Sequence, residues 1–210
     1  ESLVALRASV DARSGEAGFS SVSGDLLAVA GVLGREKSLR QMLADSGQQE
    51  SSRVGIVTSL FGDRISPEAT AVLVDVVKTR WSNDADLVDA VEILGAQAAF
   101  TTAQRDGGLD RVENELFSFA QAVDTSPELQ MALTDPSQTA EGKAALVRDL
   151  VAGTASPVTT SLLVHLAGNL RGRRPAAAVE ELAQLAAEER SRQLAEIRAA
   201  VALTPEQDQR

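Results

Sequence analysis

An internal repeat constrains this chain more strongly than any other feature of its sequence. The segments 39–80 and 129–170 have the same order of apolar residues and helix breakers, and they align without a gap at an offset of 90 positions. Each segment has a Ser-Pro pair at the same place, beginning at Ser66 in the first and at Ser156 in the second. A repeat of this length predicts two copies of one structural unit.

The repeated unit is predicted to be helical. Apolar residues recur three and four positions apart along most of the chain, which is the spacing of one face of an α-helix. Hydrophobic residues make up 44% of the chain but aromatic residues only 3%, a composition typical of helices packed on helices. We therefore expect an all-α fold. The predicted helices span about 2–13, 20–34, 37–45, 50–62, 66–81, 84–105, 109–123, 127–134, 139–152, 156–171 and 175–193.

The carboxy-terminal part of the chain has a weaker pattern. Residues 193–202 combine the β-branched Ile197 and Val201 with several alanines, so a strand and a helix both remain open there. A helix-start signal at Thr204 comes almost at the end. We expect the polypeptide to continue beyond Arg210.

Charge and composition exclude several classes of partner. The net charge is −10 at pH 7 and acidic residues are spread over both halves, so the surface repels phosphate backbones and no nucleic-acid partner is expected. The sequence has no run of 18 apolar residues, and we expect no direct membrane insertion. The absence of cysteine excludes disulfides and cysteine-ligated zinc.

Residues suited to catalysis are scarce. His165 is the single histidine, and its place among leucines indicates a packed or surface residue. The glutamate pairs at 180–181 and 188–189 are interpreted as a solvated face, because no histidine partners accompany them. The arginines within 171–174 follow a predicted helix end, where cations complement the helix dipole; an anionic partner is the alternative. We expect no catalytic residue, cofactor or metal site, and instead grooves that bind partner helices.

Short motifs follow one another in a fixed order through the second half of the chain. They are GAQAAFTTA at 95–103, Gly108 with Leu109, ENEL at 113–116, SPEL at 126–129, AEGK at 140–143, the helix end at 169–171, and EIRAAVALTPEQ at 196–207. Together they resemble the delta subunit of F-type ATP synthase, whose mitochondrial counterpart is the oligomycin-sensitivity-conferring protein. The upstream copy, with Trp81 before its last helix, is similar to the actinobacterial form of delta. One departure is Gly95, where the family usually has an aromatic residue.

The resemblance implies a particular organisation. Two delta-type six-helix bundles would share one long helix at about 84–105, which would fix the angle between them. On this basis residues 1–94 are the upstream copy, and residues 95–193 are the copy that resembles the amino-terminal domain of delta. Residues 194–210 would then be the truncated start of a carboxy-terminal α/β domain.

The resemblance also implies a function. The family links the peripheral stalk, or stator, to the top of the catalytic head of a proton-translocating ATP synthase and resists the torque of the rotor. We therefore expect a non-catalytic subunit. Its partners would be the amino-terminal helices of alpha subunits and the b subunit of the stalk, and its location would be peripheral, at the cytoplasmic face of the plasma membrane.

A docking groove can be carried over from the family. There, an amino-terminal helix of an alpha subunit lies between the first and fifth helices of the domain. In this sequence these helices correspond to 95–105 and 156–171, with an equivalent groove in the upstream copy. Apolar stripes alone leave open whether such residues face a partner or the chain's own core. The first groove would be lined by Ala96, Ala99, Phe100, Ala103, Leu163, Leu166, Ala167 and Leu170, and the second by Leu3, Leu6, Val10, Leu73, Val76 and Val77.

Two other hypotheses account for parts of the same sequence. A cytosolic helical-repeat adaptor that binds partner helices would explain the duplication without the family. An enzyme would need a polar pocket with convergent carboxylates around His165.

Overall fold

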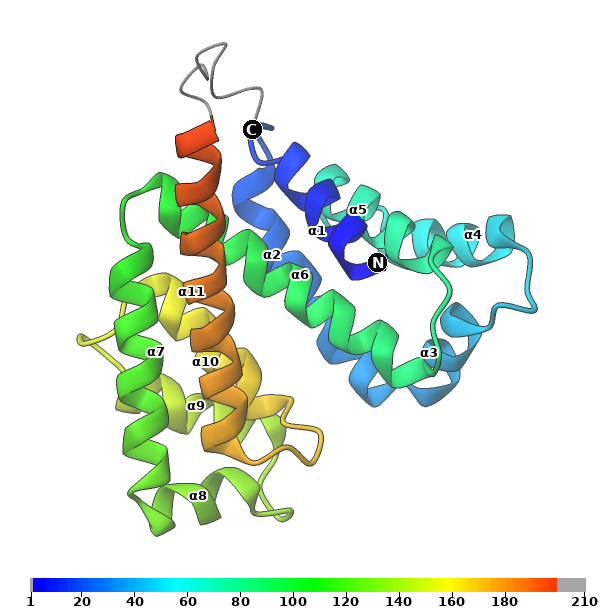
Figure 1. The fold of residues 1–210 in the computed structure, drawn as a ribbon. Coiled ribbons are helices and arrows are strands. Elements are labelled where there is room, and N and C mark those ends of the chain that lie inside the picture. The colour runs from blue at the N-terminus through cyan, green and yellow to red at the C-terminus, as the bar shows by residue number, and fades with distance from the viewer. Residues whose placement is uncertain (1, 200–210) are drawn as a thin grey trace.

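The structure is a computed structural model that describes the backbone of residues 2–199 and the side chains of residues 3–192. Within this range every regular element is an α-helix, which confirms the predicted all-α fold (Figure 1). The helices are α1 (Ser2–Ala12), α2 (Phe19–Arg35), α3 (Lys37–Ala44), α4 (Glu50–Phe61), α5 (Pro67–Lys78), α6 (Asp84–Arg105), α7 (Leu109–Asp124), α8 (Pro127–Thr134), α9 (Ala140–Leu150), α10 (Pro157–Gly168) and α11 (Pro175–Ala199).

The helices form two groups that meet along α6 (Figure 1). We call α1 to α5 with residues 84–94 of α6 the upstream bundle, and residues 95–105 of α6 with α7 to α11 the downstream bundle. In the upstream bundle α2 packs along α6, and in the downstream bundle α7 packs along α11. Among the described residues, no helix is long and apolar enough to cross a lipid bilayer.

Helix bounds in the two bundles are related by the offset of the sequence repeat. Helices α3 and α8 begin at Lys37 and Pro127, and α5 and α10 begin at Pro67 and Pro157. The counterpart of α1 is not a separate helix, because positions 92–102 lie inside α6. This agreement supports our interpretation that the bundles are two copies of one unit.

The same polar contact starts the fifth helix of each bundle. Ser66 and Ser156 cap α5 and α10 through their side-chain oxygens, and a proline follows each cap. Asp25 on α2 accepts hydrogen bonds from the Ser66 amide at 2.8 Å and the Ser66 hydroxyl at 2.7 Å. At the equivalent position of α7, Glu115 accepts from the Ser156 amide at 2.9 Å and the Thr159 hydroxyl at 2.6 Å. The contact fixes the second helix of each bundle to the fifth.

Two hydrophobic cores lie on either side of α6. Its residues Val91 and Leu94 are buried in the upstream core, whereas Phe100 and Ala103 are buried in the downstream core. Since α6 runs without a break from Asp84 to Arg105, one rigid helix contributes to both cores. Each core contains one side of the same helix, so the bundles are not independent in space.

The structure decides part of the region that the sequence left open. Helix α11 continues to Ala199, so residues 193–199 are helical and the expected boundary after residue 193 falls inside this helix. Residues 200–210, which include most of the predicted start of an α/β domain, lie outside the described residues. Helix α10 ends at Gly168, three residues before the predicted end. The chain turns there, and Arg171 and Gly172 adopt left-handed φ angles of 50° and 82°.

We expect replacement of Asp25 by alanine to lower the free energy of unfolding by about 1–2 kcal/mol, because the Ser66 amide and hydroxyl lose their common acceptor. Chemical denaturation followed by circular dichroism measures the change. Glu115→Ala should have an effect of similar size in the downstream bundle, while Asp63→Ala, at an exposed position, is the control. Equal stability of Asp25→Ala and the control would contradict the role of this contact.

Candidate helix-docking site at the junction of the bundles

Helix α2 of the upstream bundle lies against α10 of the downstream bundle. Its residue Leu27 is 4% exposed and belongs to the downstream core. Gly95 on α6 provides the space, since a Cβ atom at this position would lie only 3.0 Å from the Cγ and Cδ2 atoms of Leu27. A large side chain at Gly95, such as the aromatic residue that the resemblance led us to expect there, would collide with Leu27.

The residues expected to line the first groove are mostly interior. Seven of the eight are buried in the downstream core, and Leu170 is partly buried against it. The structure brings them together as core contacts of α6 and α10, and Leu27 packs beside them from α2. A partner helix at this place would meet exposed neighbours of these side chains. The buried residues are Ala96, Ala99, Phe100, Ala103, Leu163, Leu166 and Ala167.

The second expected groove, between α1 and α5, has a polar bridge across it. Five of its six residues, Leu6, Val10, Leu73, Val76 and Val77, are buried in the upstream core, and Leu3 is half-buried.

The bridge itself involves three side chains. The Ser9 hydroxyl of α1 donates to Asp75 of α5 at 2.7 Å. Arg13 bonds to Ser9 and forms an ion pair with Asp75 at 3.4 Å. The downstream positions equivalent to Ser9 and Arg13 are Ala99 and Ala103, so the two faces differ in chemistry.

A buried carboxylate joins α6 to the turn between α10 and α11. Glu92 is 7% exposed, and its carboxylate accepts hydrogen bonds from Arg173 at 3.0 Å and from Arg171. His165 on α10 lies 3.3 Å from the same carboxylate. Arg171 also pairs with Asp89 at 2.7 Å, one turn earlier on α6. We call Glu92, His165, Arg171 and Arg173 the junction clamp, because their hydrogen bonds and ion pairs connect the two bundles.

The junction clamp keeps Glu92 ionised. Burial by itself raises the pKa of Glu92, but the hydrogen bond to His165 and the charges of Arg173 and Arg171 outweigh it and lower the pKa to about 2. Removing these charges from water is costly, their mutual attraction offsets that cost, and the loss of one partner leaves the others uncompensated in a buried site.

The sequence interpretation of the arginine cluster was correct in part. Arg173 bonds to the carbonyl oxygens of Asn169 and Leu170, which directly follow the last residue of α10, so a cation does lie at this helix end. The anionic partner exists as well, but it is Glu92 of the same chain. Sequence reasoning missed Glu92, although a single acid within the apolar run Val91 to Phe100 was a visible signal.

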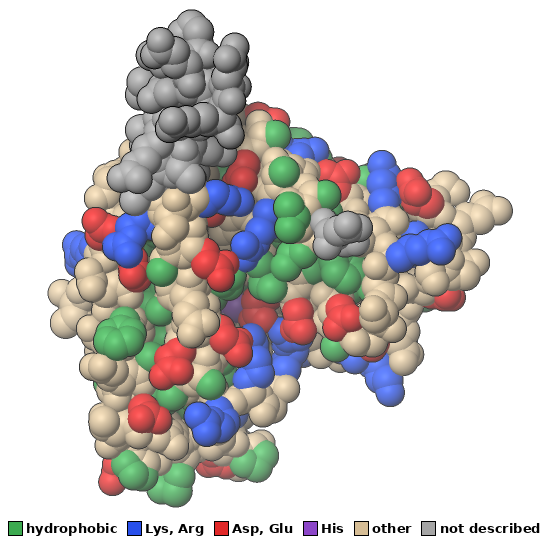
Figure 2. Space-filling view, viewed as in Figure 1, with side chains coloured by type: hydrophobic (Ala, Val, Ile, Leu, Met, Phe, Trp, Pro, Cys, Tyr) green, Lys and Arg blue, Asp and Glu red, His purple; other side chains and the backbone are tan. Residues whose placement is uncertain are grey.

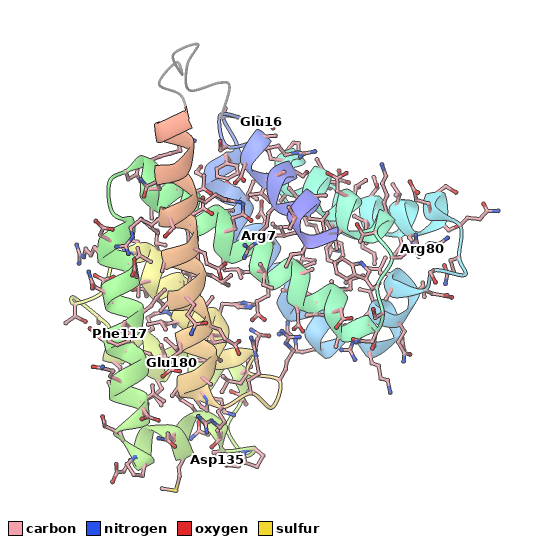
Figure 3. All side chains as sticks on the ribbon, in the orientation of Figure 1. Arg7, Glu16, Arg80, Phe117, Asp135 and Glu180 are labelled. Atoms are coloured by element: carbon pink, nitrogen blue, oxygen red, sulfur yellow. The ribbon has the colours of Figure 1, made fainter. Side chains whose placement is uncertain are left out.

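Polar contacts also connect α1 to α11 through α6. The amide of Gln97 donates to the carbonyl oxygen of Arg7 at 3.2 Å and to Asp11 at 2.7 Å. Arg192 of α11 pairs with Asp11 at 3.1 Å. Arg7, labelled in Figure 3 where α1 faces α11, pairs with Glu188 at 3.4 Å. The first helix of the upstream bundle is thus bound to the last helix of the downstream bundle.

Two hollows flank the junction. One, of about 420 Å³, lies between α6 and α11, with carboxylates at Asp89, Glu92, Glu181 and Glu188. In Figure 2 apolar side chains line the recess between these helices, with acidic and basic groups around it.

The other hollow, of about 690 Å³, lies between α2 and α10 and is lined in part by His165. Among the described residues lining this second hollow none is acidic, so the convergent carboxylates of an enzyme hypothesis are not found there. In the described part of the chain no group of three or more His, Asp or Glu side chains is arranged to hold a metal ion.

The fold and its junction define a class of protein: a helical scaffold in which two bundles share a helix and are held at one angle by buried polar contacts. The model of the ATP synthase delta (OSCP) subunit family matches residues 95–210. The chain belongs to this family of ATP synthase subunits, as the motif resemblance indicated. An unrelated helical-repeat adaptor is thereby excluded.

Several bacterial relatives match both bundles. ATP synthase subunit delta of Streptomyces griseus is 39% identical over 212 residues, which covers 100% of this chain and 78% of the relative. Subunit delta of Streptomyces avermitilis is 42% identical, with 89% of this chain and 68% of the relative covered. Subunit delta of Streptomyces coelicolor is 38% identical over 98% of this chain and 74% of the relative. Since the first match spans the whole chain, it includes the upstream bundle.

We expect Glu92→Gln to lower the free energy of unfolding at pH 7 by about 3 kcal/mol, because Arg171 and Arg173 lose their shared anion. The pKa of Glu92 in the folded chain lies below its ordinary value of 4.5, so this contribution is complete above pH 4.5 and is lost as the pH falls towards 2. The parent chain and the variant should therefore become similar in stability near pH 2.

The measurement is urea denaturation between pH 7 and pH 2. Other carboxylates titrate in both proteins, so the difference between parent and variant isolates Glu92. Glu188→Gln is the control, since Glu188 is 63% exposed and its single ion pair is at the surface. A gap between parent and Glu92→Gln that stays constant with pH would refute the electrostatic explanation.

We expect Leu27→Ala to destabilise the chain by about 3 kcal/mol and to loosen the downstream bundle although the residue lies in the upstream one. Hydrogen exchange measured by mass spectrometry should show faster exchange in α10. Exposed Ala28→Ser, next to it on α2, is the control. Faster exchange confined to α1 to α5 would show that Leu27 serves only the upstream core.

Proposed function

We propose that this chain is a non-catalytic subunit of the peripheral stalk of a proton-translocating F-type ATP synthase, located at the cytoplasmic face of the plasma membrane. In this role it links the stalk to alpha subunits at the top of the catalytic head and resists the torque of the rotor. Its partners are the amino-terminal helices of alpha subunits and the b subunit. Family membership is the observation that carries the proposal.

The junction of the bundles supports a load-bearing role. A subunit that resists torque must keep its docking faces at a constant angle. Here one unbroken helix, α6, contributes to both cores. The junction clamp involves Glu92 in the upstream part of α6, and the contacts between α1 and α11 involve Gln97 in its downstream part. Bending the bundles against each other would expose apolar side chains and separate buried charges, both of which are costly.

The docking faces are proposed on the α6–α10 and α1–α5 pairs. The side chains taken from the family motif form the interior of these faces, and a partner helix would contact the exposed residues next to them. On the upstream face these include Val4, which is 71% exposed, and Ala8. On α10 the exposed Ser161 and half-buried Val164 face outward from the buried stripe.

A peptide with the sequence of the amino-terminal helix of the alpha subunit encoded in the same genome should bind the intact chain. Titration of the isotope-labelled chain with this peptide should shift amide NMR signals within 157–168, within 2–12, or both. A peptide of the same composition in scrambled order is the control. Unchanged spectra at a large excess of the peptide would overturn the proposed attachment to alpha subunits.

A further inference from the structure

The turn between α10 and α11 reaches from the downstream bundle towards the upstream one. We call residues 169–173 the inserted turn, and Figure 1 shows it projecting towards the upstream helices just before α11 begins. The guanidinium group of Arg171 pairs with Asp89 at 2.7 Å and with Glu92, and these two acids lie one turn apart on α6. The inserted turn therefore meets two carboxylates that belong to the other bundle.

Two glycines on α2 give the inserted turn room on its other side. A Cβ atom at Gly31 would lie 3.3 Å from the Oδ1 atom of Asn169, which is closer than side chains normally pack. A Cβ atom at Gly34 would lie 3.6 Å from the Cδ atom of Arg171. Helix α2 packs along α6, so the side chain of Arg171 reaches both helices, with glycines on one side and carboxylates on the other.

The backbone of the inserted turn is strained at Arg171. Its φ angle is 50°, and among the described residues Arg171 is the one non-glycine residue with a positive φ. The left-handed conformation is disfavoured about tenfold for a residue with a Cβ atom, and glycine is the usual residue at such positions. Strain of this kind persists only where surrounding contacts hold it in place. For Arg171 the ion pairs that hold the side chain come from the other bundle.

The equivalent turn of the upstream bundle is anchored differently. Trp81 occupies the position of Arg171, 90 residues earlier, and its indole N–H donates to the carbonyl oxygen of Val76 at 3.0 Å. Trp81 also packs against the upstream core, so that turn is held by its own bundle. The inserted turn keeps Leu170 against the downstream core but directs Arg171 to the upstream part of α6.

Apolar packing leaves the bundles free to pivot unless another contact prevents it. Apart from the residues of α6 itself, Leu27 is the one described apolar residue that belongs to the core of the other bundle. A single buried side chain resists separation, but it restricts rotation about its own contact much less, because hydrophobic burial is not directional. The charged hydrogen bonds of the inserted turn have a defined geometry and supply the restriction that Leu27 does not.

We propose that the inserted turn is a conformational latch. The side chain of Arg171, placed between α2 and α6, keeps the backbone of the turn left-handed and keeps the two bundles at one angle. When this side chain withdraws, residue 171 relaxes to a negative φ, and the bundles pivot about α6 and Leu27 over a wider range of angles. The latch is a property of this chain alone and does not depend on the proposed function.

Two substitutions of the same residue test the cause of the strain. If the side chain holds the backbone, Arg171→Ala relaxes to a negative φ, whereas Arg171→Gly only makes the unfolded chain more flexible. We then expect the alanine variant to be the more stable, with an unfolding equilibrium constant about two- to fivefold below that of the glycine variant. Urea denaturation at pH 7, followed by circular dichroism, measures both constants. Equal stability, or a more stable glycine variant, would show that the fold itself imposes the left-handed conformation and would overturn the latch.

Double electron–electron resonance measures the angle between the bundles. Because the chain has no cysteine, Ser59→Cys on α4 and Gln121→Cys on α7 place one nitroxide label on each bundle, both at exposed positions. We expect one narrow distance distribution for the otherwise unchanged chain and a clearly broader one when Arg171→Ala is added. Glu188→Gln, which removes a surface ion pair between α1 and α11, is the control and should leave the distribution narrow.

The outcomes separate a latch from a general loosening of the junction. Circular dichroism and thermal unfolding establish that each labelled variant is folded. An unchanged distance distribution in a folded Arg171→Ala variant overturns the latch, and so does equal broadening by Glu188→Gln. Asp89→Asn removes the more exposed of the two acceptors; it should broaden the distribution to a smaller extent, and it replaces Arg171→Ala if that variant does not fold. Broadening by the changes at positions 171 and 89 alone supports the proposal.

Discussion

The structure depends on a single helix that belongs to two cores. Helix α6 buries Val91 and Leu94 on one side and Phe100 and Ala103 on the other. Neither core can be complete without it, so the bundles cannot separate without exposing apolar surface, at about 25 cal/mol for each Å². The shared helix restricts the angle between the bundles, and the other contacts at the junction stabilise that angle.

The charged contacts at the junction determine where the turn after α10 lies along α6. Hydrophobic burial is not directional, whereas the ion pairs of Glu92 with Arg171 and Arg173 hold the turn after α10 at one position along α6. The left-handed conformation of Arg171 belongs to the same turn and brings its side chain towards α6. Moving this turn along α6 would leave a buried carboxylate with fewer partners, which is costly.

The junction also creates surface. By leaning α2 against α10, the structure fills one expected groove with Leu27 and forms a neighbouring hollow lined by small residues and Arg148. The upstream and downstream bundles thus differ in the surface that they offer a partner. The bridge from Ser9 to Asp75 in the upstream bundle adds to this difference, because the equivalent downstream positions are Ala99 and His165.

Local features of the fold were predictable because they depend on neighbours in sequence. The Ser-Pro helix starts and the glycines after α6 act within one turn, so helix positions could be predicted to within a few residues, with α10 ending three residues early and α11 extending to Ala199. The 90-residue offset likewise predicted matching helix bounds. Family motifs predicted the family itself, and comparison with relatives bore this out.

By itself, then, the sequence determined that the chain is helical, where its helices begin, and to which family it belongs, since periodicity, caps and motifs are local properties. Only the tertiary structure decided which way each apolar stripe faces. It placed Phe100 and Leu163 in the chain's own core, paired Glu92 with arginines about 80 positions away, and set α2 beside α10. A stripe is equally apolar whether it meets its own core or a partner, and only packing in three dimensions distinguishes the two.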